Sequence, residues 1–236
     1  MIIAANWKQY LSPKEENELL LEFGSSLKLH PKQELWIFPS LYSLMCLSKL
    51  AKALDMPVTI GAQDIAPTLD GALTGGIRAD FIRGELVLIG HSERRKIFHE
   101  KITDIKKKLQ VSLDANKRVI LCVGEKKPIS DEEIIEQLQT ELDAYKEVID
   151  GRKEQVIIAY EPWWAIGGNK TPTVQTIQKV IKLLHKLGFA QVLYGGSVDP
   201  HTIGKIVCPE LAGFLIGRAS TTMTVLQAIL DQLTEM

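Results

Sequence analysis

Three side chains of this sequence could together move a proton beside a carbonyl group. Glu161 is a carboxylate that can accept a proton, and it directly follows the apolar run VIIAY at 156–160. His91 precedes Ser-Glu-Arg-Arg, which is typical of the first turn of a helix. An imidazole near a helix N-terminus is disfavoured as a cation, so His91 is expected to be a neutral hydrogen-bond donor. Lys8 offers a fixed positive charge for a developing oxyanion or an anionic substrate.

Each of these residues also has a plainer structural interpretation. A lysine near a strand end is usually a solvated charge, a lone histidine is more often structural, and a strand-end acid often caps a helix or meets an arginine. Cys122 is interpreted as a packed thiol, because nothing nearby in the sequence would activate it as a nucleophile. The chemical interpretation therefore depends on a fold that brings these side chains together.

Eight short apolar runs rich in Val, Ile and Leu recur along the chain. They lie at 2–6, 34–38, 57–61, 86–90, 118–123, 156–160, 191–195 and 212–217. Most of their apolar residues are consecutive rather than alternating, which is typical of parallel strands covered on both faces.

Helix signals separate these runs. Ser12 and Glu15 form a capping box with proline at the first helical position, and Ser130 with Glu133 repeats the box. Asp199-Pro200 offers a similar start, and the stretch 173–187 carries apolar residues at helical intervals.

Eight strand–helix units in 236 residues predict an α/β fold, a single-domain (β/α)8 barrel over 1–236 with no separate second domain. The alternative is an open doubly wound sheet, which usually carries G-x-G-x-x-G after its first strand, whereas NWKQY follows the first run here. In a barrel the carboxyl ends of the strands converge on one face, and polar residues gather at most of these ends. They include Asn6, Lys8, Gln63, His91, Glu93, Glu125, Glu161, Ser197 and Arg218.

A phosphate site is predicted after the last two strands. Ser197 follows two glycines and Arg218 follows Gly217, a pattern that suits phosphate held by backbone N–H groups. A base, a neutral electrophile, a cation and a phosphate cradle predict proton abstraction next to a carbonyl on a small phosphorylated substrate.

Composition excludes several other classes of protein. The formal net charge of −1 argues against a basic nucleic-acid-binding or membrane-surface protein. The N-terminus has no signal-peptide pattern, and no run approaches the roughly 20 apolar residues of a membrane helix. Cys46, Cys122 and Cys208 form no CxxC or Cys/His cluster, which predicts reduced thiols, no zinc site and an intracellular protein.

Six short motifs occur in a characteristic order along the chain: NWK, GHSERR, CVGE, YEPWWAIG, YGGSV and GFLIG. Through these motifs the sequence resembles the triosephosphate isomerase family along essentially its whole length. The resemblance implies the TIM-barrel fold and a cytoplasmic enzyme of glycolysis and gluconeogenesis. It implies that Glu161 transfers the proton of dihydroxyacetone phosphate, that neutral His91 polarises the carbonyl, and that Lys8 and Asn6 stabilise the enediolate.

The resemblance also assigns the remaining site residues. It implies that Gly167, Ser197, Gly217 and the backbone of Arg218 hold the phosphate. Glu93 resembles a carboxylate that supports the site from behind, and Cys122 is placed in the same supporting layer. No metal or organic cofactor is implied, because the carbonyl already acidifies the adjacent C–H and nothing has metal-ligand spacing.

The segment 162–173 resembles the closing lid of the family. Its first hinge is 162–164, its tip is 165–169 and its second hinge is 170–172. Closure of such a lid excludes water and hinders loss of phosphate from the intermediate.

Four positions depart from the usual family pattern. Trp163 stands where a small apolar residue is common, Asp64 replaces an asparagine, Gly76 replaces an acid that makes a salt bridge, and Arg218 replaces a second glycine of the phosphate loop. Retained activity is expected, because the backbone N–H of Arg218 survives and its guanidinium would not oppose a phosphate.

The loop 68–80 is long for its position, and in the family it projects into a neighbouring subunit, which implies a homodimer with Thr74 near the partner's site. Two rival functions remain open. Another phosphate-binding barrel, acting on a sugar or indole phosphate, would need an additional catalytic lysine or acid on other strands, which the strand ends here do not supply. A catalytically inactive barrel that binds a phosphorylated metabolite would be marked by loss of Glu161, His91 or Lys8, and all three are present.

Overall fold

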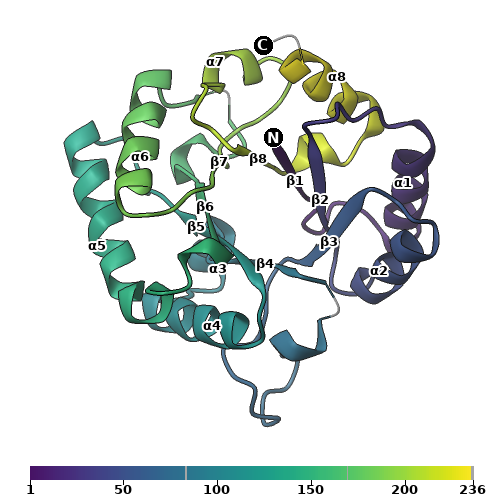
Figure 1. Ribbon diagram of the computed structural model, residues 1–236, viewed down its shortest axis with the longest axis horizontal. Coiled ribbons are helices and arrows are strands. Elements are labelled where there is room, and N and C mark those ends of the chain that lie inside the picture. The colour runs from purple at the N-terminus through teal and green to yellow at the C-terminus, as the bar shows by residue number, and fades with distance from the viewer. Residues whose placement is uncertain (83, 169, 235–236) are drawn as a thin grey trace.

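In the computed structural model, which describes residues 1–82, 84–168 and 170–234, eight parallel strands close into a barrel (Figure 1). The strands follow one another in chain order around the barrel, and β8 pairs with β1. The strands are β1 (Ile2–Asn6), β2 (Glu34–Phe38), β3 (Val58–Ala62), β4 (Leu86–Ile89), β5 (Arg118–Val123), β6 (Val156–Tyr160), β7 (Val192–Tyr194) and β8 (Gly213–Ile216). The predicted barrel is confirmed, and the doubly wound alternative is wrong.

Helices surround the barrel. They are α1 (Pro13–Ser26), α2 (Leu44–Ala53), α3 (Ser92–Ile97), α4 (Ile102–Asp114), α5 (Asp131–Ile149), α6 (Val174–Lys186), α7 (Ile203–Ile206) and α8 (Met223–Thr234). Short 3-10 turns add η1 (Ala79–Phe81), η2 (Lys153–Gln155), η3 (Trp163–Ala165) and η4 (Arg218–Ser220). No helix of the described chain is both long and apolar enough to cross a membrane.

The local sequence signals account for several helix starts. Both capping boxes are confirmed, at Ser12 for α1 and at Ser130 for α5. The expected start at Asp199-Pro200 is displaced: Oδ1 of Asp199 accepts from the N–H groups of His201 and Thr202, which form a turn, and regular helix begins only at Ile203. The described part of the connection between β3 and β4, which contains the long loop expected at 68–80, holds only η1, whereas β4 is followed by both α3 and α4.

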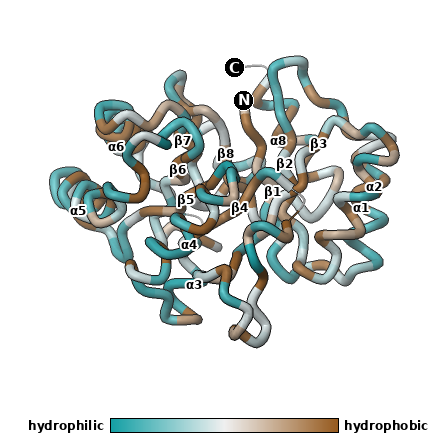
Figure 2. The backbone as a smooth tube through the Cα atoms, turned by 60° about the horizontal axis from the view of Figure 1, so that its bottom comes forward, coloured by the Kyte–Doolittle hydropathy of each residue, from teal (hydrophilic) through white to brown (hydrophobic). Residues whose placement is uncertain are grey.

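The strands are buried on both faces, which explains their consecutive apolar residues. One apolar cluster fills the barrel interior and includes Ile2, Ala4 and Trp36, whereas Ile3 and Ala5 belong to the layer between barrel and helices. Figure 2 shows brown segments recurring along the strands and mixing with teal along the outer helices.

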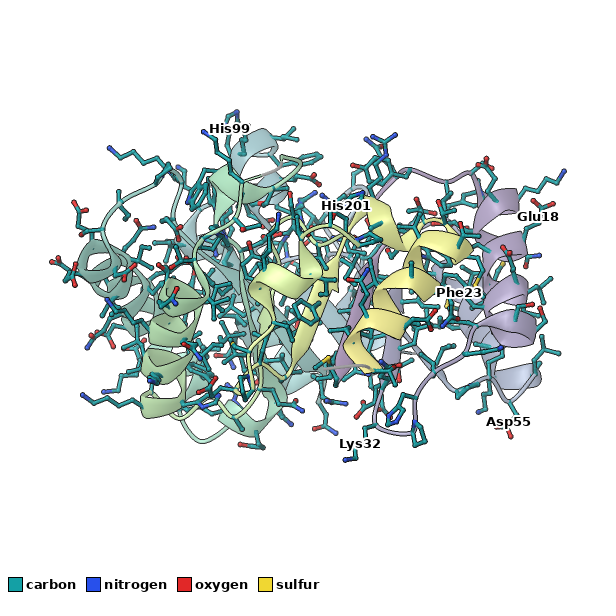
Figure 3. The ribbon with its side chains drawn as sticks, turned by 90° about the horizontal axis from the view of Figure 1, so that it is seen from above. Glu18, Phe23, Lys32, Asp55, His99 and His201 are labelled. Atoms are coloured by element: carbon teal, nitrogen blue, oxygen red, sulfur yellow. The ribbon has the colours of Figure 1, made fainter. Side chains whose placement is uncertain are left out.

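The carboxyl ends of the strands share one end of the barrel. Figure 3 shows His99 and His201, which follow β4 and β7, toward one end of the molecule, and Lys32 and Asp55, which precede β2 and β3, at the other. Residues that directly follow the strands therefore meet at a single face.

Barrel closure depends on a close contact at Gly213. A Cβ placed on this residue would lie 1.9 Å from the carbonyl oxygen of Ile2, on the neighbouring strand β1. Only a residue without a Cβ permits β8 to approach β1 this closely.

We expect Gly213→Ala to destabilise the protein by about 3 kcal/mol or more, because the clash is with backbone and cannot be relieved by a side-chain rotation. Urea unfolding followed by circular dichroism measures this. Gly71→Ala is the matched control, since a Cβ there meets nothing within 4 Å. Equal stabilities of the two variants would contradict the closure argument.

Candidate active site

His91 and Glu161 form the centre of the site. His91 follows β4 and caps the N-terminus of α3, and Glu161 follows β6. Nε2 of His91 lies 2.9 Å from Oε1 of Glu161, and the two residues are only 6% and 2% exposed. Nδ1 of His91 accepts a hydrogen bond from the backbone N–H of Glu93 at 3.1 Å. A nitrogen that accepts carries no proton, so the imidazole is neutral and Nε2–H donates to Glu161.

The Glu161 carboxylate is held as an anion. Its Oε2 accepts from the backbone N–H of Ser92 at 3.0 Å. Burial is the largest influence on the pKa of Glu161 and raises it, whereas a charge on His91, the hydrogen bonds from His91 and Ser92 and the charge of Lys8 lower it. With a neutral imidazole, the two hydrogen bonds and Lys8 are the influences that favour the carboxylate form. Two donors, Nε2–H of His91 and the backbone N–H of Ser92, thus contact the carboxylate of Glu161.

Lys8 enters the site on an unusual backbone. Its φ of 51° lies in the left-handed region, which non-glycine residues rarely adopt. The N–H of Lys8 donates to Oδ1 of Asn6 at 3.2 Å, and Nε2 of Gln63 donates to its carbonyl oxygen at 2.8 Å. Nζ of Lys8 lies 2.6 Å from Oε1 of Glu93. Asn6, Gln63 and Glu93 thus fix the cation that the sequence predicted at the end of β1.

The short helix α3 is tied to the barrel by two arginines. Arg95 donates to the carbonyl oxygens of Gly90 at 2.6 Å and Cys122 at 2.7 Å and pairs with Glu141 at 2.6 Å. Arg94 pairs with Asp64 at 3.0 Å. Because α3 begins directly after His91, these ties also fix the imidazole.

Asp64 occupies a buried cluster of charges. Its Oδ1 lies 2.6 Å from Nζ of Lys108, which also pairs with Glu100. Burial raises the pKa of Asp64, with the Lys108 and Arg94 charges opposing the rise. The acid at this position of the sequence therefore has two cationic partners within the same chain.

Cys122 lies in the barrel interior beneath the base. Its burial and the neighbouring Glu161 carboxylate raise the pKa of its thiol well above the ordinary range. Such a thiol stays protonated and fills space, in line with the packed role predicted from the sequence.

The four predicted phosphate residues lie on three loops. Ser197 contacts the lid: its Oγ donates to the carbonyl oxygen of Ala165 at 2.6 Å and accepts from the N–H of Gly168 at 3.2 Å. Gly167 has φ 71°, so the lid tip uses a conformation that favours glycine.

Gly217 lies beside the lysine of the site, because a Cβ placed on it would come within 3.5 Å of Cε of Lys8. Arg218 follows directly, opens η4 and is exposed.

The first lid hinge is tied to the end of β5. Nε1 of Trp164 donates to Oε1 of Glu125 at 2.7 Å, and the Tyr160 hydroxyl donates to the same oxygen at 3.2 Å. The Trp163 N–H donates to the carbonyl oxygen of Glu125 at 2.9 Å, and Nζ of Lys126 lies 5.3 Å from the centre of the Trp163 ring. Trp163, which departs from the family pattern, thus has Lys126 as a cationic partner for its indole ring. Asn169, expected at the lid tip, lies outside the described residues.

Sequence reasoning did not assign roles to Gln63, Ser92 and Glu125. Gln63 and Glu125 each follow a strand closely, which was the available signal. Ser92 acts through its backbone N–H, so its side-chain type carries no signal at all.

The arrangement defines a class of protein: a (β/α)8-barrel enzyme that moves protons. A carboxylate, a neutral imidazole donor and a lysine meet where substrate could reach all three, at the carboxyl ends of β1, β4 and β6. Within the described ranges, no three or more His, Cys, Asp or Glu side chains group so as to hold a metal ion.

Comparison with known proteins identifies the particular family. The sequence model of the Triosephosphate isomerase family matches residues 1–233. The chain is 38% identical over 232 residues to the triosephosphate isomerase of Bdellovibrio bacteriovorus, covering 93% of this chain and 94% of that protein. It is 34% identical over 238 residues to the triosephosphate isomerase of Dictyoglomus turgidum, with the same two coverages. The chain belongs to the triosephosphate isomerase family of aldose–ketose isomerases, as the motifs indicated.

The buried Glu125 carboxyl gives a prediction for pH dependence. Burial raises its pKa above the ordinary 4.5, and the Trp164 and Tyr160 donors offset this only in part. Between about pH 4.5 and the raised pKa, Glu125 is protonated in the folded state but ionised in the unfolded state. Unfolding then releases a proton, so the Glu125 carboxyl makes the folded state less stable as pH rises through this range. We expect the stability of Glu125→Gln relative to wild type to increase with pH in that window, by at most about 1.4 kcal/mol per pH unit.

Urea unfolding between pH 4 and 8 measures the difference. The exposed Glu132→Gln is the control for loss of one carboxylate. A difference that is constant or falls with pH would show that the Glu125 pKa is not raised.

Proposed function

We propose that Glu161, His91, Lys8 and Asn6 interconvert dihydroxyacetone phosphate and D-glyceraldehyde 3-phosphate through an enediolate. This reaction is the activity of the family to which the chain belongs. The observation that carries the assignment of roles is the contact between Nε2 of His91 and Oε1 of Glu161 at 2.9 Å, with Nδ1 of His91 engaged by a backbone N–H.

The first proton transfer uses the base. The Glu161 carboxylate takes the proton from the hydroxymethyl carbon, the C–H electrons form the carbon–carbon double bond, and the carbonyl oxygen receives the negative charge. Nε2–H of His91 and the Lys8 ammonium stabilise this oxygen, where preorganised donors act most strongly. Substrate must first replace Glu161 as the acceptor for His91, since the two are bonded to each other in the free protein.

The second transfer completes the isomerisation. Protonated Glu161 returns a proton to the neighbouring carbon, and His91 moves a proton between the two oxygens, so the base and the imidazole end as they began. Ser197, Gly167, Gly217 and the Arg218 backbone hold the phosphate, and Glu93 and Cys122 support the reacting groups. Closure of the segment 162–173 over the phosphate excludes water.

We expect Glu161→Gln to lower kcat by about 10²- to 10⁴-fold with little change in KM, because an amide cannot accept the proton while its shape is retained. A coupled assay with dihydroxyacetone phosphate, without added metal, measures this, and Glu132→Gln is the matched surface control. A folded wild type without turnover would instead favour the inactive phosphate-binding barrel.

We also propose that residues 1–236 act as one domain, in the cytoplasm, as a homodimer through the loop 68–80. Support for the location comes from the three cysteines, which are free in the described structure. Support for the dimer comes from the segment between β3 and β4, which projects from the barrel at the bottom of Figure 1. It exposes Leu73 at 42% and Phe81 at 65%, and Phe98, after α3, is 62% exposed.

We expect Leu73→Asp to raise the dimer dissociation constant by at least about tenfold, because it would bury a carboxylate in an apolar contact. Sedimentation velocity at micromolar concentration measures this. Leu54→Asp is the control, since Leu54 is 53% exposed but lies after α2, at the opposite end of the barrel. A wild type that sediments as a monomer would refute the dimer.

A further inference from the structure

Arg218 places a cation in the loop proposed to hold the substrate phosphate. It is exposed at the start of η4, and no carboxylate within the described ranges lies at ion-pair distance from its guanidinium. The hydrogen bonds found at this residue use its carbonyl oxygen, which accepts from the N–H and hydroxyl of Thr221. The side chain is therefore free to meet a ligand.

The other cations near the site are already engaged. Lys8 pairs with Glu93 at 2.6 Å, Arg94 with Asp64 at 3.0 Å and Arg95 with Glu141 at 2.6 Å. A carboxylate at such a distance cancels much of the field of its cation. Arg218 has no such partner among the described residues, so its charge is available to an anion that arrives from solution.

The backbone that carries Arg218 is held firmly. The Ser220 hydroxyl donates to the carbonyl oxygens of Ile216 at 3.1 Å and Gly217 at 2.8 Å. Nε1 of the buried Trp7 donates to the Ser220 carbonyl oxygen at 3.1 Å. Gly217 in turn lies beside Lys8, since a Cβ placed on this glycine would be 3.7 Å from Nζ. The backbone of Arg218, one residue further along, is thus held next to the reacting end of the site, and its long side chain is within reach of a ligand there.

We propose that the Arg218 guanidinium is a direct ligand of the substrate phosphate, added to the backbone N–H groups of this loop. The proposal rests on the proposed function for the nature of the anion. The planar guanidinium presents parallel N–H donors that match two phosphate oxygens, and such charge-assisted pairs are stronger than neutral hydrogen bonds. A glycine at the same position offers only its N–H.

The direct test is calorimetric titration of the whole protein with inorganic phosphate. We expect Arg218→Ala to weaken binding about three- to tenfold, as befits a charged contact partly screened by water. Arg218→Lys should retain part of the affinity, because it keeps the charge without the fork. Lys52→Ala, at the far end of the barrel on α2, removes the same charge from the protein and should change binding less than twofold.

A second variant separates side chain from backbone. Arg218→Gly also removes the guanidinium but restores the glycine that is usual at this position of the family, so we expect it to bind phosphate as weakly as Arg218→Ala. Wild-type affinity in Arg218→Gly, or an Arg218→Ala effect no larger than that of Lys52→Ala, would overturn the proposal. Wild-type binding should also fall more steeply with added salt than binding by Arg218→Ala.

The outcome is independent of turnover. Phosphate binding that depends on Arg218 in a wild type that does not isomerise dihydroxyacetone phosphate would refute the proposed function and support the ligand role. Rapid turnover, together with phosphate binding that does not depend on Arg218, would support the proposed function and refute the ligand role of Arg218.

Discussion

The polarity of the site follows from one hydrogen bond, donated by the backbone N–H of Glu93 to Nδ1 of His91. Because that nitrogen accepts, the proton of the neutral ring must be on Nε2, which faces Glu161. A cationic ring in the same place would lose this bond and face the positive end of α3. The helix start therefore makes His91 the donor and Glu161 the acceptor of their shared hydrogen bond, which is the arrangement that the proposed reaction requires.

That hydrogen bond is reliable only if α3 is immobile, and a helix of six residues has little stability of its own. Side-chain contacts from three successive residues stabilise the helix. Glu93 pairs with Lys8, Arg94 pairs with Asp64, and Arg95 donates hydrogen bonds at the ends of β4 and β5. Each tie reaches a strand end or the residues just beyond it. The barrel thus serves as a rigid frame to which the imidazole is attached through side chains.

The strands could be predicted from the sequence because burial on both faces leaves a continuous apolar run, as in VIIAY before Glu161. The reacting groups were predictable because their types are chemically distinctive. The contacts of Gln63, Ser92 and Glu125 were not predictable, although Gln63 and Glu125 were recognised at strand ends, because their partners are distant in sequence. The start of α7 was missed because Asp199 bonds its own loop and delays the helix. The partners of Asp64, which are Arg94 on α3 and Lys108 on α4, could be identified only from the three-dimensional structure.

The left-handed backbone at Lys8 has a consequence for how this enzyme can change. An L-residue with φ near 51° carries a conformational penalty of about 1 kcal/mol that glycine would not. Glycine at this position would relax the chain, but it would remove the ammonium group that faces Glu93. Under the proposed role of Lys8, the change that would relax the backbone is also the change that would remove the catalytic cation, so stability and turnover oppose each other at this residue.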